Sequence, residues 1–196
     1  MPAAAHDIES PSPWVCRWAG LIRRAGRVLD VACGHGRHLR YLRSLGFSVV
    51  GVDRDASVRP LLDGMAGVEF HVADIESGAW PFAPAEFDGV VVTNYLHRPL
   101  FATLVDALRP GGVLVYETFA AGNERYGRPS NPDFLLRDGE LFERTRPLGL
   151  IAFEQGLISA PKRAVVQRIC AVRDGGSPVP LDGPLESADG NAFGLK

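Results

Sequence analysis

A strand, a tight turn and a helix follow one another in residues 27–47, and this unit constrains the fold more than any other part of the chain. The apolar run 28–31 leads into a turn that contains Gly34 and Gly36, after which leucines recur at helical spacing from Leu39. Glycine adopts backbone angles closed to other residues and lets a ligand approach the main chain. The helix start presents unpaired N–H groups to the same place. The unit therefore predicts a ligand site at the edge of an α/β sheet.

The residues around the turn exclude two common nucleotide loops. The dinucleotide fingerprint G-x-G-x-x-G/A requires glycine or alanine where this chain has Leu39. A Walker A loop requires Gly-Lys-Ser/Thr after the turn, and that tripeptide is absent. What remains is Asp30 at the strand end, followed by Ala32, Gly34 and Gly36. This pattern resembles motif I of the class I methyltransferases that depend on S-adenosylmethionine (SAM).

The resemblance implies SAM as cofactor and S-adenosylhomocysteine as product. It also implies that the turn lies against the methionine part of SAM and that Asp30 helps to hold its ammonium group. Ala32 stands where the family most often has its first glycine, a mild departure because a methyl group fits where only moderate closeness is needed.

Two further strands end in carboxylates. The run 47–53 ends in Asp53, placed where a ribose diol is normally bound, although Asp is also a common helix N-cap and that role stays open. The alternating run 68–73 is followed by Asp74 and Ile75, which the resemblance places against adenine. Asp74 as an ordinary turn residue is the alternative. The predicted cofactor-binding residues are Asp30, Ala32, Gly34, Gly36, Arg37, Asp53, Arg54, Asp74, Ile75 and Asn94.

The run 87–93 is apolar throughout its second half, as a central parallel strand should be. Ligands bind outside the carboxyl ends of strands in open α/β sheets, so Asn94, Tyr95 and His97 are expected to face the transferred methyl group. Glu117, near the end of the next strand, is a fourth catalytic candidate. His97 is either a general base or a satisfied structural histidine, and both interpretations stay open.

Strands that alternate with helices predict a parallel sheet. The runs 150–159 and 163–173 are joined by three residues, too few for a parallel crossover, so they predict an antiparallel hairpin. The turn 108–112, Leu-Arg-Pro-Gly-Gly before an apolar strand, is also similar to the family. The predicted fold is α/β: a doubly wound, Rossmann-like seven-stranded sheet, mostly parallel, with a C-terminal antiparallel hairpin and helices on both faces.

Residues 117–136 form a long polar stretch, and such stretches inside compact domains are commonly lids or binding loops. The stretch resembles the TehB-like branch of small methyltransferases, often labelled tellurite-resistance or small-molecule methyltransferases. A solvated loop held by its own side chains is the alternative. A helix is predicted over 135–144. The candidates to close over SAM and donate to an anionic acceptor are Arg125, Tyr126, Arg128 and Asn131.

At the N-terminus, Ser12 and Pro13 predict a helix start. The apolar face that follows is expected to pack on the sheet edge beside the glycine turn. Trp18 is assigned to the core, with a place at the ligand pocket as the alternative. The predicted organisation is a flexible segment 1–11, a methyltransferase domain 12–173 and a disordered tail 174–196.

Length and composition limit the kinds of partner that are expected for this protein. A chain of 196 residues, 46% hydrophobic, is sufficient for one domain, and a net charge of -2 gives no overall attraction to nucleic acid. No apolar run has membrane-spanning length, and no signal peptide is recognisable, so a soluble cytoplasmic protein is expected. The three cysteines lack metal-binding spacing, so reduced thiols and no metal are expected. The expected partner is a small-molecule acceptor, without membrane or nucleic acid, for a monomer or homodimer.

These patterns predict transfer of a methyl group from SAM to a small molecule by in-line displacement. The acceptor atom is left open between a thiol, an oxyanion or metalloid, and a hydroxyl. A non-catalytic SAM-binding subunit and an NAD-dependent oxidoreductase are the competing hypotheses. An enclosed pocket lined by Asn94, Tyr95, Glu117 and Arg128 favours the enzyme, whereas a flat apolar patch there favours the subunit.

Overall fold

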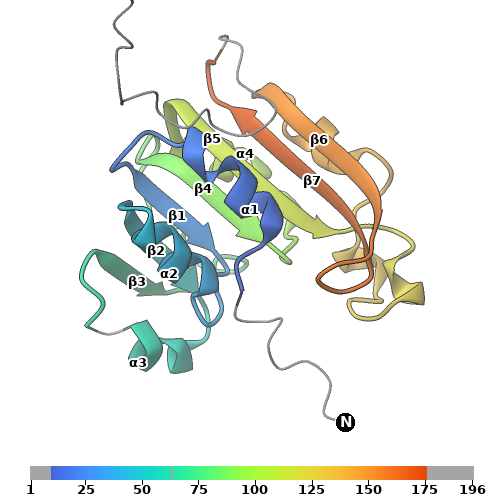
Figure 1. Cartoon of the computed structure of the whole chain (residues 1–196), viewed down its shortest axis with the longest axis horizontal. Coiled ribbons are helices and arrows are strands. Elements are labelled where there is room, and N and C mark those ends of the chain that lie inside the picture. The colour runs from blue at the N-terminus through green and yellow to red at the C-terminus, as the bar shows by residue number, and fades with distance from the viewer. Residues whose placement is uncertain (1–9, 63, 176–196) are drawn as a thin grey trace, which may run out of the picture.

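A single seven-stranded sheet runs through the protein (Figure 1). The computed structural model describes residues 10–62 and 64–175. The strand order is β3-β2-β1-β4-β5-β7-β6, with β1 to β5 parallel and β7 antiparallel to both β5 and β6. The predicted mostly parallel sheet with an antiparallel hairpin is thus confirmed. The strands are β1 (Arg27–Val31), β2 (Ser48–Asp53), β3 (Val68–Val72), β4 (Phe87–Thr93), β5 (Leu108–Phe119), β6 (Gly149–Ile158) and β7 (Ala164–Val172).

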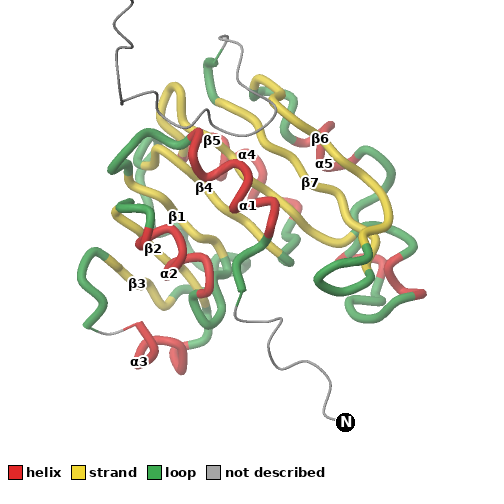
Figure 2. Tube along the Cα trace, viewed as in Figure 1, coloured by secondary structure: helices red, strands yellow, loops and turns green. Residues whose placement is uncertain are grey.

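Helices cover both faces of the sheet (Figure 2). On one face lie α1 (Pro13–Trp18), α2 (Arg37–Ser44) and α3 (Arg59–Leu62). On the other lie α4 (Phe101–Ala107) and α5 (Glu140–Arg144). Short 3₁₀ helices occupy Ala19–Leu21, Ala56–Val58, Arg98–Leu100, Asn123–Arg125 and Pro132–Phe134. Within the described ranges, no helix has both the length and the apolar character needed to cross a membrane.

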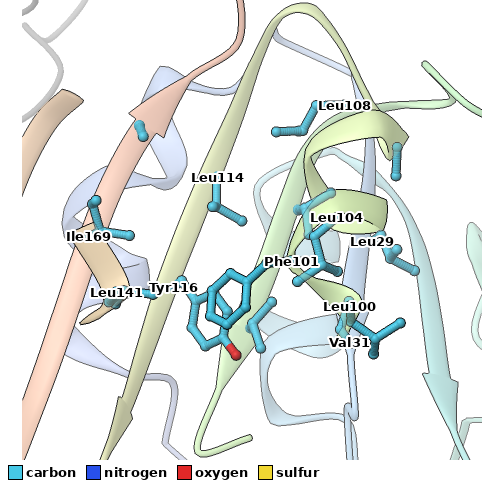
Figure 3. Packing of buried hydrophobic residues seen from close by; sticks show 14 of the residues in the cluster. Leu29, Val31, Leu100, Phe101, Leu104, Leu108, Leu114, Tyr116, Leu141 and Ile169 are labelled. Atoms are coloured by element: carbon cyan, nitrogen blue, oxygen red, sulfur yellow. The ribbon is translucent and has the colours of Figure 1, made fainter. Parts of the chain in front are cut away.

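Two hydrophobic clusters hold these layers together, one on each side of the sheet. Neighbouring residues of β4 alternate between them, with Val91 in one cluster and Val90 and Val92 in the other. This two-sided burial explains why the strand is a continuous apolar run. On the α4 side, the rings of Phe101 and Tyr116 stack with centroids 5.5 Å apart (Figure 3).

The N-terminal helix begins as predicted but packs elsewhere. Ser12 caps α1 by accepting a hydrogen bond from the N–H of Trp14, and Pro13 is the first helical residue. The helix lies across the face of the sheet rather than at its edge, because the indole N–H of Trp14 donates to the carbonyl of Ile169 in β7, 3.1 Å away. Trp18 is completely buried in the core and does not line the pocket.

The predicted helix over 135–144 is shorter than expected. The helix over 135–144 begins only at Glu140, because Leu136 is extended and bonds the main chain at the end of β5: its N–H donates to the carbonyl of Phe119. Helix α3 ends at Leu62, and Gly64 beyond it has a left-handed φ of +81°. Apart from residues 10, 11, 174 and 175, the predicted flexible terminus and tail lie outside the described residues.

Candidate functional site

The turn after β1 is built from left-handed residues. Ala32, Gly34 and Gly36 have φ values of +52°, +50° and +76°. A Cβ added to Gly36 would lie 2.6 Å from Leu62 Cδ2, whereas a Cβ added to Gly34 would meet nothing within 4 Å. Packing against α3 therefore requires the second glycine. The first one borders open space in front of the turn, where a ligand has room.

Asp53 braces this turn from the end of β2. Its Oδ2 accepts a hydrogen bond from the N–H of Gly34 at 2.8 Å, and its Oδ1 accepts one from the N–H of Asp55 at 3.0 Å. The helix N-cap is Asp55, whose carboxylate accepts from the N–H of Ser57, so the capping role left open for Asp53 belongs to its neighbour. The partly exposed Asp53 carboxylate keeps acceptor capacity beside the turn.

Asp30 is a buried carboxyl group without a full set of partners. It is 1% exposed, and its Oδ2 has no hydrogen-bond partner in the described part of the chain. Burial raises the pKa of Asp30 to about 8, with Arg37 acting in the opposite direction. An unsatisfied buried acceptor costs roughly 1–3 kcal/mol. A cationic ligand group at the turn would remove this cost, so the residues fit the ammonium group that the sequence resemblance implies.

A cavity of about 710 Å³ begins at the glycine turn. It passes the carboxyl ends of β4 and β5 and reaches the turn between β6 and β7 and residues 117–136, the segment predicted to be a lid and called the lid below. Its size lies within the range of small-molecule sites. The four residues expected around an acceptor, Asn94, Tyr95, Glu117 and Arg128, all line it, together with Arg37.

Contacts between distant parts of the chain form the polar wall of the cavity. Ser12 Oγ donates to Glu117 Oε1 at 2.8 Å, and Arg168 Nη1 donates to Glu117 Oε2 at 3.3 Å. The N–H of Ser12 donates to His38 Nε2 at 3.0 Å. Burial, with Arg37 nearby, lowers the pKa of His38 to about 3, so its ring is neutral and carries its proton on Nδ1, 3.4 Å from Thr93 Oγ1.

Sequence reasoning missed these partnerships. Ser12 was recognised only as a helix cap, and His38 and Arg168 were not singled out. Ser12 is 105 residues from Glu117, and Arg168 is 51 residues from it. The cap signal at Ser12 was the only local hint that its hydroxyl has a fixed place.

Several predicted residues lie outside the cavity lining. His97 is partly buried, and its Nδ1 is 4.0 Å from Glu76 Oε2. Asp74 is exposed and accepts hydrogen bonds from the N–H groups of Glu76 and Ser77 and from the Ser77 hydroxyl, the contacts of a turn residue. Ile75 beside it is 8% exposed, and Arg54 is exposed. Arg54 and Asp74 thus lie exposed beyond the ends of β2 and β3, whereas Ile75 is buried.

The lid places two of its four predicted residues in the cavity wall. Tyr126 and Arg128 line the cavity, whereas Arg125 and Asn131 do not. Asn131 instead caps a short 3₁₀ helix through its side-chain oxygen. The buried Asn123, which the sequence did not single out, donates to the carbonyl of Pro129 and accepts from the N–H of Val165.

An ion pair anchors the far end of the lid. Arg98, just after β4, donates to both carboxylate oxygens of Glu140 at 2.8 and 2.9 Å and to the carbonyls of Asp133 and Leu135. The hydrogen bond from Arg98 lowers the pKa of Glu140 to about 2. A bidentate, charge-assisted pair of this kind fixes geometry as well as adding stability.

Comparison with known proteins agrees with this geometry. A family model described as a methyltransferase domain matches residues 28–112, which begin in β1 and end within β5. The match supports a methyltransferase domain with S-adenosylmethionine as its cofactor. The glycine turn, Asp30 and Asp53 all lie within the matched residues.

Individual relatives of the methyltransferase domain show the same relationship. A malonyl-[acyl-carrier protein] O-methyltransferase of Enterobacter lignolyticus is 39% identical over 107 residues, 50% of this chain and 41% of that protein. The chain covers less than half the length of the first three curated relatives.

Solved structures share the fold of the domain. A Burkholderia thailandensis 1,6-didemethyltoxoflavin N1-methyltransferase with bound S-adenosylhomocysteine has a TM-score of 0.63, with 19% identity and coverage of 83% of this chain and 77% of that one. TehB of Haemophilus influenzae has a TM-score of 0.65, with 18% identity and coverage of 79% and 60%.

Proposed function

We propose that this protein transfers the methyl group of SAM to a small molecule bound in the cavity. The observation that carries the proposal is one continuous cavity, which extends from the glycine turn to a wall of Tyr95, Glu117 and Arg128. A hollow with convergent polar groups is typical of an enzyme, whereas a flat apolar patch is typical of a partner surface. This favours catalysis over a non-catalytic SAM-binding subunit.

Each predicted cofactor-binding residue is assigned to one part of SAM. SAM, when bound, supplies an electrophilic methyl group on a sulfonium. Asp30 Oδ2 is proposed to accept from the ammonium group, with Arg37 beside the carboxylate. Asp53 is proposed to bind the ribose hydroxyls. Asp74 and Ile75, with Arg54 near them, are proposed for adenine, where the exposed Asp74 carboxylate keeps lone pairs beyond its turn contacts.

On the acceptor side, the protein chiefly holds the nucleophile in line and keeps water out. Positioning of this kind lowers barriers by several kcal/mol, on the order of 7–11 at best. An ionised acceptor needs no base. For a neutral hydroxyl, Glu117 and Tyr95 are the groups that line the cavity, and Glu117 is held in place by Ser12 and Arg168. The name of the malonyl-[acyl-carrier protein] O-methyltransferase, a relative, supports an oxygen acceptor as the first to test.

The resemblance of residues 117–136 to TehB-like methyltransferases supports a small-molecule branch of the family. Arg98, which follows β4, joins the lid to this end of the sheet by donating to the carbonyls of Asp133 and Leu135, and Tyr126 and Arg128 of the lid line the cavity.

Calorimetric titration with SAM, S-adenosylhomocysteine and NADH tests the proposal. Wild type is compared with Asp53→Ala and with the control Asp55→Ala, which removes a neighbouring exposed carboxylate that does not contact Gly34. Both adenosyl ligands are expected to bind wild type and the control, and to bind Asp53→Ala at least about tenfold more weakly. NADH is expected not to bind any of the three proteins. Absence of adenosyl binding by folded wild type would refute the proposal.

A turnover assay distinguishes a methyltransferase from a non-catalytic SAM-binding subunit. Release of S-adenosylhomocysteine in the presence of candidate acceptors is expected, beginning with hydroxyl and thiol compounds. The non-catalytic subunit would be favoured instead if the protein binds SAM tightly, forms a stable complex with another protein and leaves the SAM unreacted.

A further inference from the structure

Three cations gather at one end of the cavity. Arg128 belongs to the lid, and Lys162 and Arg163 belong to the turn between β6 and β7. The two segments face each other: the guanidinium of Arg163 lies 5.0 Å from the ring centroid of Tyr126, and a Cβ added to Gly127 would lie 3.5 Å from Lys162 Nζ. Figure 1 shows the hairpin turn beside the lid.

These cations have no carboxylate of their own in the described part of the chain. None of the ion pairs among residues 10–62 and 64–175 involves any of the three. The carboxylate that lines the cavity, Glu117, is already paired with Arg168 at 3.3 Å. In a chain with a net charge of -2, this is a local excess of positive charge at a cavity mouth. A cleft lined by one sign of charge concentrates ligands of the opposite sign.

Part of the cavity wall near the cations is apolar. Phe119, Ile158 and Val166 line it, and Phe119 and Val166 are paired across β5 and β7. The cofactor end lies over β1 and β4, and the cations lie at the start of β7. Since β7 is two strands from β4, the separation along the sheet is roughly 10 Å at the usual strand spacing. A bare oxyanion is too small to reach both ends.

We propose that the methyl acceptor is an organic anion with an apolar body, whose carboxylate or phosphate group is bound by Arg128, Lys162 and Arg163. Its apolar body lies along Phe119, Ile158 and Val166, and its nucleophilic atom lies near Tyr95 and Glu117. This inference rests on the proposed methyl transfer and adds the substrate class to it. Arg37 is left to the cofactor, because it directly follows the glycine turn.

Binding of phenyl phosphate and benzoate to the protein loaded with S-adenosylhomocysteine tests the anion site, with benzamide as the neutral probe. Calorimetry at constant ionic strength compares wild type, Arg128→Gln/Lys162→Gln and the control Arg24→Gln/Arg146→Gln. The control removes the same charge from exposed positions outside the cavity. Both anions are expected to bind wild type and the control, to bind the test variant at least about tenfold more weakly, and to bind more tightly than benzamide.

The outcomes distinguish a failure of the anion site from a failure of the proposed methyl transfer. Equal binding of the anions to all three proteins, or no anion binding to loaded wild type, would overturn the anion site while leaving methyl transfer intact. Failure of wild type to bind S-adenosylhomocysteine would refute the proposed function, and this inference with it. If only the double variant loses S-adenosylhomocysteine binding, the single variant Lys162→Gln takes its place and the same criteria apply.

Discussion

Replacement of Gly34 and of Gly36 by alanine should impair the protein for two different reasons. At both positions alanine must adopt a left-handed conformation, which costs roughly 1–2 kcal/mol. Gly36→Ala also drives a Cβ to within 2.6 Å of the buried Leu62 side chain, and overpacking of this kind adds about 1–3 kcal/mol. Gly34→Ala meets no atom within 4 Å but fills space at the cavity wall. We therefore expect Gly36→Ala to lose about 2–5 kcal/mol of stability and Gly34→Ala about 1–2.

Urea denaturation and calorimetric titration with S-adenosylhomocysteine, carried out on both variants, separate these effects. Gly34→Ala should keep most of its stability and lose cofactor affinity by at least about tenfold. Gly36→Ala should lose more stability. Its weaker binding should be accounted for by the fraction of protein that is unfolded. If Gly34→Ala binds the cofactor as wild type does, the open space in front of the turn is not the cofactor site. If Gly36→Ala is the more stable variant, the packing argument is wrong.

Two further predictions follow from charged groups in the site. Burial holds the pKa of Asp30 at about 8 without ligand, far above its ordinary value of 3.8. A bound ammonium group should displace the proton from the Asp30 carboxyl, so SAM affinity should rise with pH and stop rising near pH 8, where the α-amino group of SAM begins to lose its own proton. Calorimetry across that range should show this slope in wild type and not in Asp30→Asn, and a flat wild-type profile would contradict the assignment. Glu140→Gln should cost about 2–4 kcal/mol at neutral pH, since it breaks the buried side of the Arg98 pair. Because the folded pKa of Glu140 is depressed to about 2 from an ordinary 4.5, this difference in unfolding free energy should shrink as pH falls through that window, and a constant difference would argue against the ion pair.

Local patterns were sufficient for most of the fold. The strand predicted over 87–93 has those bounds in the structure, and the hairpin was predicted from a short connection, which spans residues 159–163 in the structure. Periodicity and turn chemistry act over a few residues, so they are legible in sequence. The helix predicted from residue 135 failed where a long-range pairing, Leu136 against the end of β5, outweighed local preference.

The placement of α1 failed for a similar reason. Its cap and its apolar face were correctly predicted, but its location depends on the indole of Trp14 bonding to β7, a strand more than 150 residues along the chain. Sequence periodicity indicates which face of a helix is buried, and it does not indicate what that face is buried against.

The strand-turn-helix unit at one end of the cavity is the part that the sequence determined by itself. Gly34, Gly36 and Asp30 belong to one continuous strand-turn-helix unit, and Asp53 follows on the next strand, so a local resemblance to a family motif was enough to propose SAM. The acceptor end was decided only by the tertiary structure. Ser12 meets Glu117 across 105 residues, and the lid meets the hairpin turn because the sheet order brings β7 beside β5. Contacts of this kind depend on how strands are arranged in space, and no local pattern in the chain encodes that arrangement.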